Sequence, residues 1–484
     1  MREKGYLAVR HSKGRRVFGA ISALLAVLLA TAAGEGMAES PSEDRTPSRA
    51  ARQTRPNIIL IMTDDQRANT LWTMPRTRRL LVRKGVKFQN GFVSNSLCCP
   101  SRASTLTGQY SHSTGVYTNY MPFGGFRAFK DKSTVATWLN RAGYRTALIG
   151  KYFNQYKNYR YVAPGWDEWH VFSSRPGNGG GFYSYKLSVN GEEKGFGHRP
   201  RHYSTDVLAR RALRFVRSSD KPFFLNFTPF APHGDVPAPR HEGMFENKNP
   251  PIRPSYDEED VSDKPEWVRE LRKIGDVHLR LRNLETLVAV DEAIGKLVRL
   301  LRKQGELRNT FIVFTSDNGK GWGEHRWSDK SDPYRGSTQV PFVVRYDRWV
   351  QGNRVDAKHL VLNMDLAPTF ADLANVGLPI DADGRSLEPV LRRNARNWRE
   401  DFLLEHLEDK RDVPSYCGIR SLKWLYVAYD TGEEELYNLT KDPYELENLA
   451  NNLDHASTVS NLRDRVKKLC SPAPPGYEFP SGPL

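Results

Sequence analysis

Residues 57–65 contain the stretch that decides the fold, and they read Asn57-Ile58-Ile59-Leu60-Ile61-Met62-Thr63-Asp64-Asp65. The run is uncharged and almost wholly apolar until Asp64, and it has the length of one strand. Continuous apolarity, without alternation, predicts a strand that is buried on both faces. Such strands occur where helices cover both sides of a mostly parallel sheet, so the stretch predicts an α/β fold.

Three further runs have the same character, at residues 146–149, 222–227 and 310–315. Helical periodicity lies between the strands, at residues 133–143, 206–216 and 284–301. Strands that alternate with helices predict a mostly parallel central sheet sandwiched by helices. Segments 155–203 and 234–272 are rich in glycine, proline, aromatic and charged residues, and we expect them to be long surface loops.

The composition changes after residue 391. Short strand patterns follow at residues 402–405, 417–420, 424–428 and 435–437, with a helical pattern at 462–469. They predict a smaller α+β subdomain that carries an antiparallel sheet. We therefore expect a main domain at residues 56–391, a C-terminal subdomain at 392–475 and a tail at 476–484.

The N-terminus has the pattern of a secretory signal peptide, which we place at residues 1–38. Arg10, Lys13, Arg15 and Arg16 form a positive region before an uncharged apolar run at 18–33, and small residues follow. The run is short for a stable span of about 20 residues, so we expect no membrane span. Residues 39–55 are polar and predict a disordered linker. The protein should be secreted or held in the cell envelope, and Arg15-Arg16 also fits twin-arginine export.

The 484-residue chain carries a formal net charge of +16. Residues 1–38 hold six lysines and arginines against two acids, so the remainder carries +12. Such a balance favours polyanionic partners. Ordinary base composition in the source organism is the alternative explanation.

Polar residues follow each predicted strand, where ligands bind in open α/β sheets. They are Asp64 and Asp65, Asp317 and Asn318, Lys151, and His233 a few residues further on. Three carboxylates and an amide oxygen suit Ca²⁺ or Mg²⁺, and a cage made wholly of protein ligands favours Ca²⁺. The alternative is that each aspartate only caps a turn.

A divalent cation beside Lys151 and His233 would form a site for an anionic oxo-group. The cation and the lysine would hold oxygens as charge develops, and the histidine could protonate a leaving oxygen. Phosphate esters and sulfate esters both fit this description.

The chain has only four cysteines, too few for a disulfide scaffold: Cys98, Cys99, Cys417 and Cys470. Cys417 and Cys470 could pair or remain buried thiols. Residues 97–108 read Leu97-Cys98-Cys99-Pro100-Ser101-Arg102-Ala103-Ser104-Thr105-Leu106-Thr107-Gly108. Pro100 suits the first turn of a helix and Gly108 its end, which puts Cys98 at the N-terminus, where an anion is favoured. Two structural or metal-binding thiols are the alternative, but no histidine or cysteine follows at zinc spacing.

Residues 97–108 resemble the sulfatase signature, Cys-x-Pro-Ser-Arg followed by Leu-Thr-Gly. The resemblance covers about residues 56–475 and is strongest to N-acetylglucosamine-6-sulfatases and extracellular heparan sulfate sulfatases, through residues 150–156, 164–166 and 436–448. It implies that a formylglycine-generating enzyme converts Cys98 to formylglycine. The resemblance also implies that calcium is bound by Asp64, Asp65, Asp317, Asn318 and the modified Cys98. It implies that Arg102 contacts the formylglycine hydrate. Sulfate would be bound by Lys151, His233 and Lys330, which would also assist the leaving oxygen.

Two positions depart from the family pattern. Phe153 stands where many sulfatases have a histidine, which makes His112 a further candidate for substrate contact or for the base that expels sulfate. The Tyr-Glu pair that is common after the Lys330 position is Tyr334-Arg335 here, which adds positive charge.

The resemblance implies a secreted sulfuric ester hydrolase that acts on sulfated sugars such as N-acetylglucosamine-6-sulfate or glycosaminoglycans, with a sulfated carbohydrate as its partner and no nucleic acid. One alternative is a phosphate or phosphonate monoester hydrolase on the same scaffold. Another is a non-catalytic secreted protein that binds polyanions, for which the basic stretch at 269–282 would serve.

Overall fold

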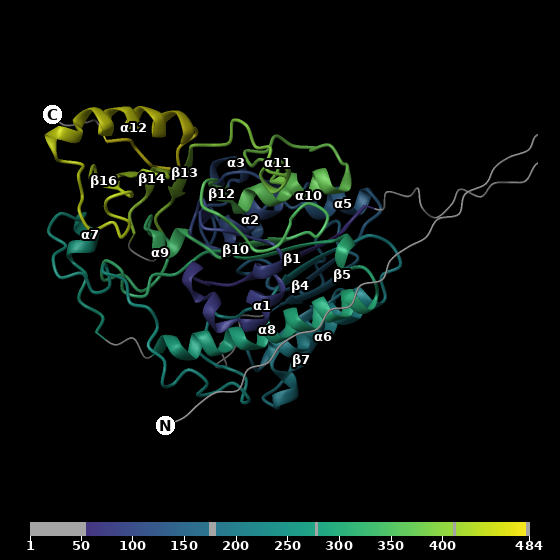
Figure 1. The fold of residues 1–484 in the computed structure, drawn as a ribbon. Coiled ribbons are helices and arrows are strands. Elements are labelled where there is room, and N and C mark those ends of the chain that lie inside the picture. The colour runs from purple at the N-terminus through teal and green to yellow at the C-terminus, as the bar shows by residue number, and fades with distance from the viewer. Residues whose placement is uncertain (1–54, 174–180, 276–278, 410–412, 481–484) are drawn as a thin grey trace, which may run out of the picture. The chain divides into compact units, whose positions relative to one another are not determined.

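The computed structural model describes residues 55–173, 181–275, 279–409 and 413–480, which belong to one compact unit (Figure 1). The predicted signal peptide and nearly all of the predicted linker lie outside the described residues. Within the described ranges, no helix combines the length and the apolar character needed to cross a membrane.

The centre of the fold is a ten-stranded sheet in the order β11-β2-β10-β9-β1-β8-β4-β5-β6-β7. Its strands are β1 (Asn57–Thr63), β2 (Val86–Phe88), β4 (Arg145–Gly150), β5 (Glu168–Phe172), β6 (Tyr185–Val189), β7 (Glu192–Phe196), β8 (Phe223–Thr228), β9 (Thr310–Ser316), β10 (Phe342–Arg345) and β11 (Arg354–Asp356). The five strands β9, β1, β8, β4 and β5 are mutually parallel. The predicted mostly parallel α/β sheet is therefore confirmed.

Helices cover both faces of this sheet (Figure 1). The α-helices of the described residues are α1 (Pro75–Leu80), α2 (Cys98–Thr107), α3 (Ser111–Thr114), α4 (Gly125–Ala128), α5 (Val135–Arg141), α6 (Ser204–Arg217), α7 (Glu266–Arg269), α8 (Leu279–Lys303), α9 (Arg335–Thr338), α10 (Leu366–Ala374), α11 (Glu388–Leu391) and α12 (Ala456–Leu469). Of these, α12 packs on the C-terminal strands and not on the large sheet. Leu60 of β1 packs in the same cluster as residues of α2, α5 and α10, whereas Ile59 packs with α6 and α8. Both faces of β1 are thus buried, because neighbouring side chains of a strand point to opposite sides.

The expectation of a long surface loop at residues 155–203 is wrong. This segment contributes β5, β6 and β7, which extend the sheet to one edge by antiparallel pairing after β5. The exposed edge strand β7 reads Glu-Glu-Lys-Gly-Phe and carries no apolar alternation. Charged residues on an edge strand discourage pairing with other chains. The same residues interrupt the apolar pattern by which a buried strand can be predicted from sequence. Segment 234–272 forms only the short α7 and is otherwise irregular.

The C-terminal part forms the predicted antiparallel sheet, in the order β13 (Asp401–His406), β14 (Tyr416–Ser421), β15 (Trp424–Tyr429) and β16 (Glu434–Asn438). The main part also contains a two-stranded parallel sheet of β3 (Gly91–Phe92) and β12 (Val361–Leu362). One face of the four-stranded sheet packs on α12, through Val459 and Val466. The other packs on Phe92 and Tyr334 of the main part. This second contact brings the C-terminal sheet close to the segment that follows Lys330.

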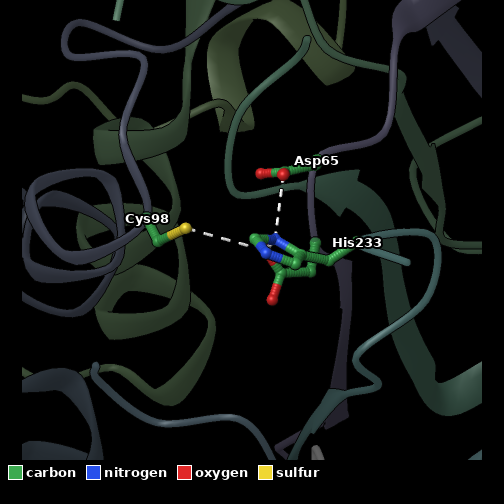
Figure 2. A group of neighbouring side chains, drawn as sticks. Asp65, Cys98 and His233 are labelled. Atoms are coloured by element: carbon green, nitrogen blue, oxygen red, sulfur yellow. Dashed lines mark hydrogen bonds and ion pairs between the residues drawn. The ribbon is translucent and has the colours of Figure 1, made fainter. Parts of the chain in front are cut away.

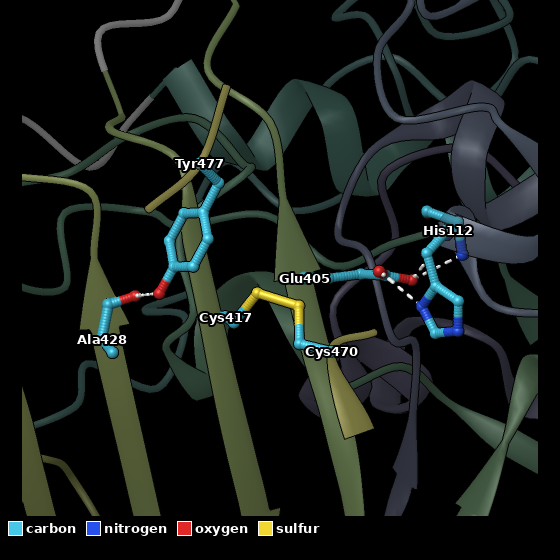
Figure 3. Close-up of a disulfide and its surroundings, with 7 residues drawn as sticks. His112, Glu405, Cys417, Ala428, Cys470 and Tyr477 are labelled. Atoms are coloured by element: carbon cyan, nitrogen blue, oxygen red, sulfur yellow. Dashed lines mark hydrogen bonds and ion pairs between the residues drawn. A yellow bond between two sulfur atoms is a disulfide. The ribbon is translucent and has the colours of Figure 1, made fainter. Parts of the chain in front are cut away.

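Cys417 of β14 and Cys470, at the end of α12, form a disulfide (Figure 3). The bridge closes a loop with a sequence separation of 53 residues. By the loop-entropy relation, a closure of this length stabilises the folded state by about 4 kcal/mol. Next to it, Tyr477 donates a hydrogen bond to the carbonyl of Ala428 at 2.9 Å. Together these contacts fasten Cys470 and Tyr477, which follow α12, to the C-terminal sheet.

Candidate active site

The site begins where β1 and β9 end side by side. Thr63 pairs with Ser316 in the parallel register, so the residues that follow each strand are neighbours. The backbone N–H of Asp65 donates to Asp317 Oδ1 at 3.0 Å, and the Asn318 amide donates to Asp65 Oδ1 at 2.7 Å. Asp65 has a φ of 64°, which turns the chain sharply out of the strand. The parallel sheet thus brings together two acidic turns that are about 250 residues apart in sequence.

Cys98 is the first residue of α2, whose ten residues are all buried. Gly108 ends the helix with a φ of 80°, a left-handed conformation that glycine adopts without strain. The Cys98 thiol lies 3.7 Å from Asp64 Oδ1 and 3.0 Å from Lys330 Nζ. The helix therefore presents Cys98 to the strand-end carboxylates.

Three cationic side chains surround the carboxylates. Lys151 Nζ lies 2.6 Å from Asp64 Oδ2, and Lys330 Nζ donates to Asp65 Oδ1. His233 Nδ1 lies 3.1 Å from Asp64 Oδ1 and 2.8 Å from Asp65 Oδ2. Figure 2 shows Cys98 and Asp65 both directed toward the His233 ring, Cys98 from the left and Asp65 from above. The His233 side chain is 34% exposed, whereas both aspartates are buried, so the histidine lies on the open side of the cluster.

Arg102 and Asp317 form a second, wholly buried pair beneath the cluster. The Arg102 guanidinium donates to Asp317 Oδ2 from Nε at 2.9 Å and from Nη2 at 2.7 Å. It also donates to the carbonyl of Lys151 at 2.8 Å, and Nη2 lies 3.8 Å from Asp64 Oδ2. Arg102 thus ties α2 to the ends of β9 and β4.

The electrostatics of the cluster follow from these contacts. Burial alone would raise the pKa of Asp64, but Lys151 and His233 outweigh it and hold the pKa well below its usual range. His233 and Lys330 likewise hold the pKa of Asp65 far below its usual range against its burial. Burial would lower the pKa of His233, but Asp65 and Asp64 raise it above the ordinary value. Burial raises the pKa of the Cys98 thiol despite Lys151 and Lys330, so an unmodified thiol there is a poor nucleophile.

The donor set fits a hard divalent cation. Ligand atoms of Asp64, Asp65, Cys98 and His233 lie within 4.8 Å of one another. The side-chain oxygen of Asn318 is buried and accepts no hydrogen bond from any described residue. An oxygen left without a donor beside two ionised carboxylates is suited to a cation that prefers oxygen ligands.

The contacts of His112 are with residues outside the cluster around Cys98. Its Nδ1 is 3.0 Å from Glu405 Oε2 of β13 (Figure 3). The His112 ring also stacks on Tyr110. Burial lowers the pKa of His112, but the bond to Glu405 raises it above the ordinary value overall. His112 therefore joins the signature region to the C-terminal sheet, whereas Lys151, His233 and Lys330 gather around Cys98.

Two features of the site were not predicted from sequence. Lys320 Nζ lies 4.0 Å from Asp65 Oδ2, on a side chain that is 33% exposed. Because Lys320 follows Asn318 by two residues, its position in the sequence could have predicted that it lies near the strand-end carboxylates. The second feature is a buried network on Glu435, which accepts hydrogen bonds from Tyr334 at 2.6 Å, Tyr429 at 2.7 Å and Tyr437 at 2.5 Å.

The Glu435 network holds the segment that carries Lys330. Tyr334 follows Lys330 by four residues, and Tyr416 donates to the carbonyl of Ser331 at 2.9 Å. We expect Glu435→Ala to lower kcat/KM on an aryl sulfate by about 10- to 100-fold, because a displacement of about 1 Å at a reacting group can have that effect. Steady-state kinetics and a thermal melt would measure the change.

The adjacent Glu434 is the matched control. It binds Arg463 at 2.6 Å and does not contact residues 330–334 in the described structure. Glu434→Ala should lower the melting temperature and leave kcat/KM within about threefold. Equal loss of kcat/KM in the two variants would show that Glu435 acts only through general stability.

Carboxylates, lysines and a histidine around a helix N-terminus at the carboxyl edge of a parallel sheet define a site for an anionic oxo-ester. A family model described as Sulfatase matches residues 56–376, and one described as N-sulphoglucosamine sulphohydrolase, C-terminal, matches residues 323–471. The chain belongs to the sulfatase family.

Individual relatives agree with this assignment. The chain is 37% identical over 427 residues to the extracellular sulfatase SULF-1 homolog of Drosophila melanogaster, covering 82% of this chain but 37% of that protein. It is 31% identical to human N-acetylglucosamine-6-sulfatase, with 89% of each protein covered. A solved structure in complex with its substrate D-glucosamine-2-N,6-O-disulfate has a TM-score of 0.76 at 27% identity, covering 86% of this chain and 98% of that one. The phosphonate monoester hydrolase of Agrobacterium radiobacter shares the fold, with a TM-score of 0.70 at 21% identity, over 86% of this chain and 96% of that one.

Proposed function

We propose that this protein hydrolyses sulfate esters of sulfated sugars, with a nucleophile made from Cys98 by conversion to formylglycine. The observation that carries the proposal is the position of Cys98, buried at the start of α2 between Lys330 and Asp64. A hydrated aldehyde at this position would supply two hydroxyls on one carbon, one to attack sulfur and one through which sulfate is expelled again.

The proposed metal is one Ca²⁺ ion, held by Asp64, Asp65, Asp317, Asn318 and the modified Cys98. Every ligand of this proposed set supplies an oxygen atom, which favours Ca²⁺ or Mg²⁺ over zinc or copper. When bound, such an ion would polarise a sulfate oxygen and favour the ionised form of the nucleophile. The unpartnered oxygen of Asn318 and the ionised Asp64 and Asp65 support this assignment.

The basic residues would bind the ester and its charge. Lys151 and Lys330 remain protonated at neutral pH, because nearby carboxylates raise the pKa of each against the effect of burial. They would neutralise sulfate oxygens on both sides of Cys98. His233, with its raised pKa and its exposed edge, would donate the proton to the leaving sugar oxygen.

The substrate we propose is a sulfated amino sugar, as a monosaccharide or within a glycosaminoglycan. Its support is the match to N-acetylglucosamine-6-sulfatases over most of both chains and the glucosamine disulfate in the related solved structure. The net charge of the chain is in keeping with a polyanion. We also propose that the protein is secreted, because relatives named as extracellular sulfatases match it.

A mass measurement tests the proposal at the nucleophile. The tryptic peptide Phe88–Arg102 of protein made in its native host should have lost the mass that separates CH2–SH from an aldehyde at Cys98, with Cys99 unchanged. The same protein should hydrolyse an aryl sulfate faster than the matching aryl phosphate. An intact Cys98 in a host that converts other sulfatases would refute the mechanism, and a preference for phosphate would favour the phosphate or phosphonate hydrolase that the fold also permits.

A further inference from the structure

The carboxyl edge of the sheet carries a second group of basic residues beyond the catalytic cluster. β10 is antiparallel to both β9 and β2, so β2 runs in the same direction as β9 and β1. The residues after Phe88 of β2 and before Phe342 of β10 therefore lie at the same edge as Asp64 and Asp317. Three strand spacings separate β2 from β1, which amounts to about 14 Å.

A cavity of about 570 Å³ opens at this place, between the edge of the large sheet and the turn that joins β14 to β15. Four basic side chains line it, and none of its described lining residues is acidic: Lys87, Arg253, Arg335 and Arg420. Its volume is within the range of about 300–1,000 Å³ that is usual for sites of small organic ligands.

The charge of the arginines is only partly compensated. Arg420 pairs with the buried Glu445 at 2.8 Å. Arg335 donates from Nε to the neutral side chain of Gln339 at 2.8 Å. Arg253 is half-buried and makes no side-chain hydrogen bond or ion pair with any described residue. Its burial and the nearby Arg67 lower the pKa of Arg253 to about 10 and outweigh the attraction of Glu324 and Glu445, which act on it from beyond ion-pair distance. A half-buried guanidinium that makes no hydrogen bond or ion pair with a described side chain is unfavourable for folding, so its presence in a cavity points to a ligand.

The other lining residues select among anions. Tyr444 and Leu422 are 38% and 46% exposed at the cavity, which offers an aromatic ring and an apolar surface to the face of a sugar. The side-chain oxygen of Asn69 is buried without a donor and can accept from a hydroxyl. An inorganic sulfate ion would use the arginines alone, whereas an acidic sugar would use all three kinds of group.

We propose that this cavity binds an anionic sugar residue, sulfated or carboxylated, of the same oligosaccharide whose sulfate ester lies at Cys98. The inference rests on the proposed function and extends it, because it assigns a second subsite about 14 Å along the sheet edge. A monosaccharide cannot reach both places, whereas a short oligosaccharide can. The enzyme should therefore bind longer substrates more tightly through Arg253 and Arg335.

The test measures binding separately from turnover. In a Cys98→Ala background, the dissociation constants of a heparin hexasaccharide and of glucosamine-2-N,6-O-disulfate would be compared for the parent and for Arg253→Gln/Arg335→Gln. We expect the double substitution to weaken the hexasaccharide at least tenfold and the monosaccharide less than twofold. In the formylglycine-containing enzyme, kcat/KM on an aryl sulfate should stay within twofold.

Arg302→Gln/Lys303→Gln is the matched control, since it removes the same charge from exposed residues at the end of α8. The control should leave hexasaccharide binding within twofold. Equal loss in the control, or unchanged hexasaccharide binding in the Arg253/Arg335 variant, would overturn the proposal. Equal weakening of the monosaccharide would also overturn it, because the cavity would then belong to the catalytic site.

Two further outcomes keep the result interpretable. Arg253→Gln alone should not lower the melting temperature, because Arg253 binds no described side chain; a marked drop would show a structural role and count against a ligand site. A protein that hydrolyses no sulfate ester, but whose hexasaccharide binding still depends on Arg253 and Arg335, would refute the proposed function and retain the cavity as a glycan site.

Discussion

Cys98→Ala should abolish turnover of an aryl sulfate, with kcat lower by about 10⁴- to 10⁶-fold, as is usual when an enzyme loses its nucleophile. The fold should persist, because the change removes a single sulfur atom, and its neighbours Lys330 and Asp64, at 3.0 Å and 3.7 Å, keep their ion pairs with Asp65 and Lys151. Steady-state rates and a thermal melt measure the two effects. Residual activity above about 10⁻² of the parent would show that Cys98 is not the nucleophile.

Cys99 is the natural control, since it is equally buried and adjacent in the chain. Burial raises the pKa of the Cys99 thiol to about 12, so it is neutral, and its sulfur accepts the backbone N–H of Asn154 at 3.2 Å. Cys99→Ser should keep kcat within about threefold. Cys98→Ser, left unconverted, has a single hydroxyl and should release at most one equivalent of phenol per site. Sustained turnover by that variant would remove the need for a hydrate.

The fold could be predicted where burial leaves an unbroken signal. The apolar runs at β1, β4, β8 and β9 are buried on both faces, and each was recognised from sequence. The edge strand β7 could not be predicted in this way, because its side chains are not buried. β7 is exposed and charged, so its place in the sheet comes from pairing with β6 and from no pattern of its own.

The residues of the candidate site also differ in how well the sequence predicts their positions. Asp64, Asp317 and Lys151 could be placed together because parallel strands end at one edge of the sheet. Contacts between the main part and the C-terminal sheet could not be predicted from the sequence. Glu405 meets His112 over 293 positions, and Glu435 meets Tyr334 over 101. No local pattern links such residues, and each contact depends on how the C-terminal sheet packs against the main part.

Removal of divalent cations should also abolish activity and should lower the melting temperature by a few degrees. Asp64 and Asp65 are buried and remain ionised at neutral pH, because nearby lysine and histidine side chains hold the pKa of each well below its usual range. An ion present at 100 times its dissociation constant stabilises the fold by about 2.7 kcal/mol. The experiment treats the enzyme with a chelator, removes the chelator, and follows activity and melting as Ca²⁺ or Mg²⁺ is restored. Unchanged activity in the metal-free enzyme would refute a catalytic cation.

Asn318 provides the sharper form of this prediction, because its buried side-chain oxygen accepts no hydrogen bond from a described residue. Asn318→Ala should weaken Ca²⁺ binding at least tenfold, a loss of the size seen when a group that supports a metal site is removed. Asn140→Ala, at an exposed side chain that binds Asp167 at 3.1 Å, should leave Ca²⁺ affinity unchanged. Calorimetric titration would measure both. Restoration by Ca²⁺ at lower concentration than by Mg²⁺ would fit a flexible cage of protein oxygens, whereas preference for Mg²⁺ would require a more regular, partly hydrated site.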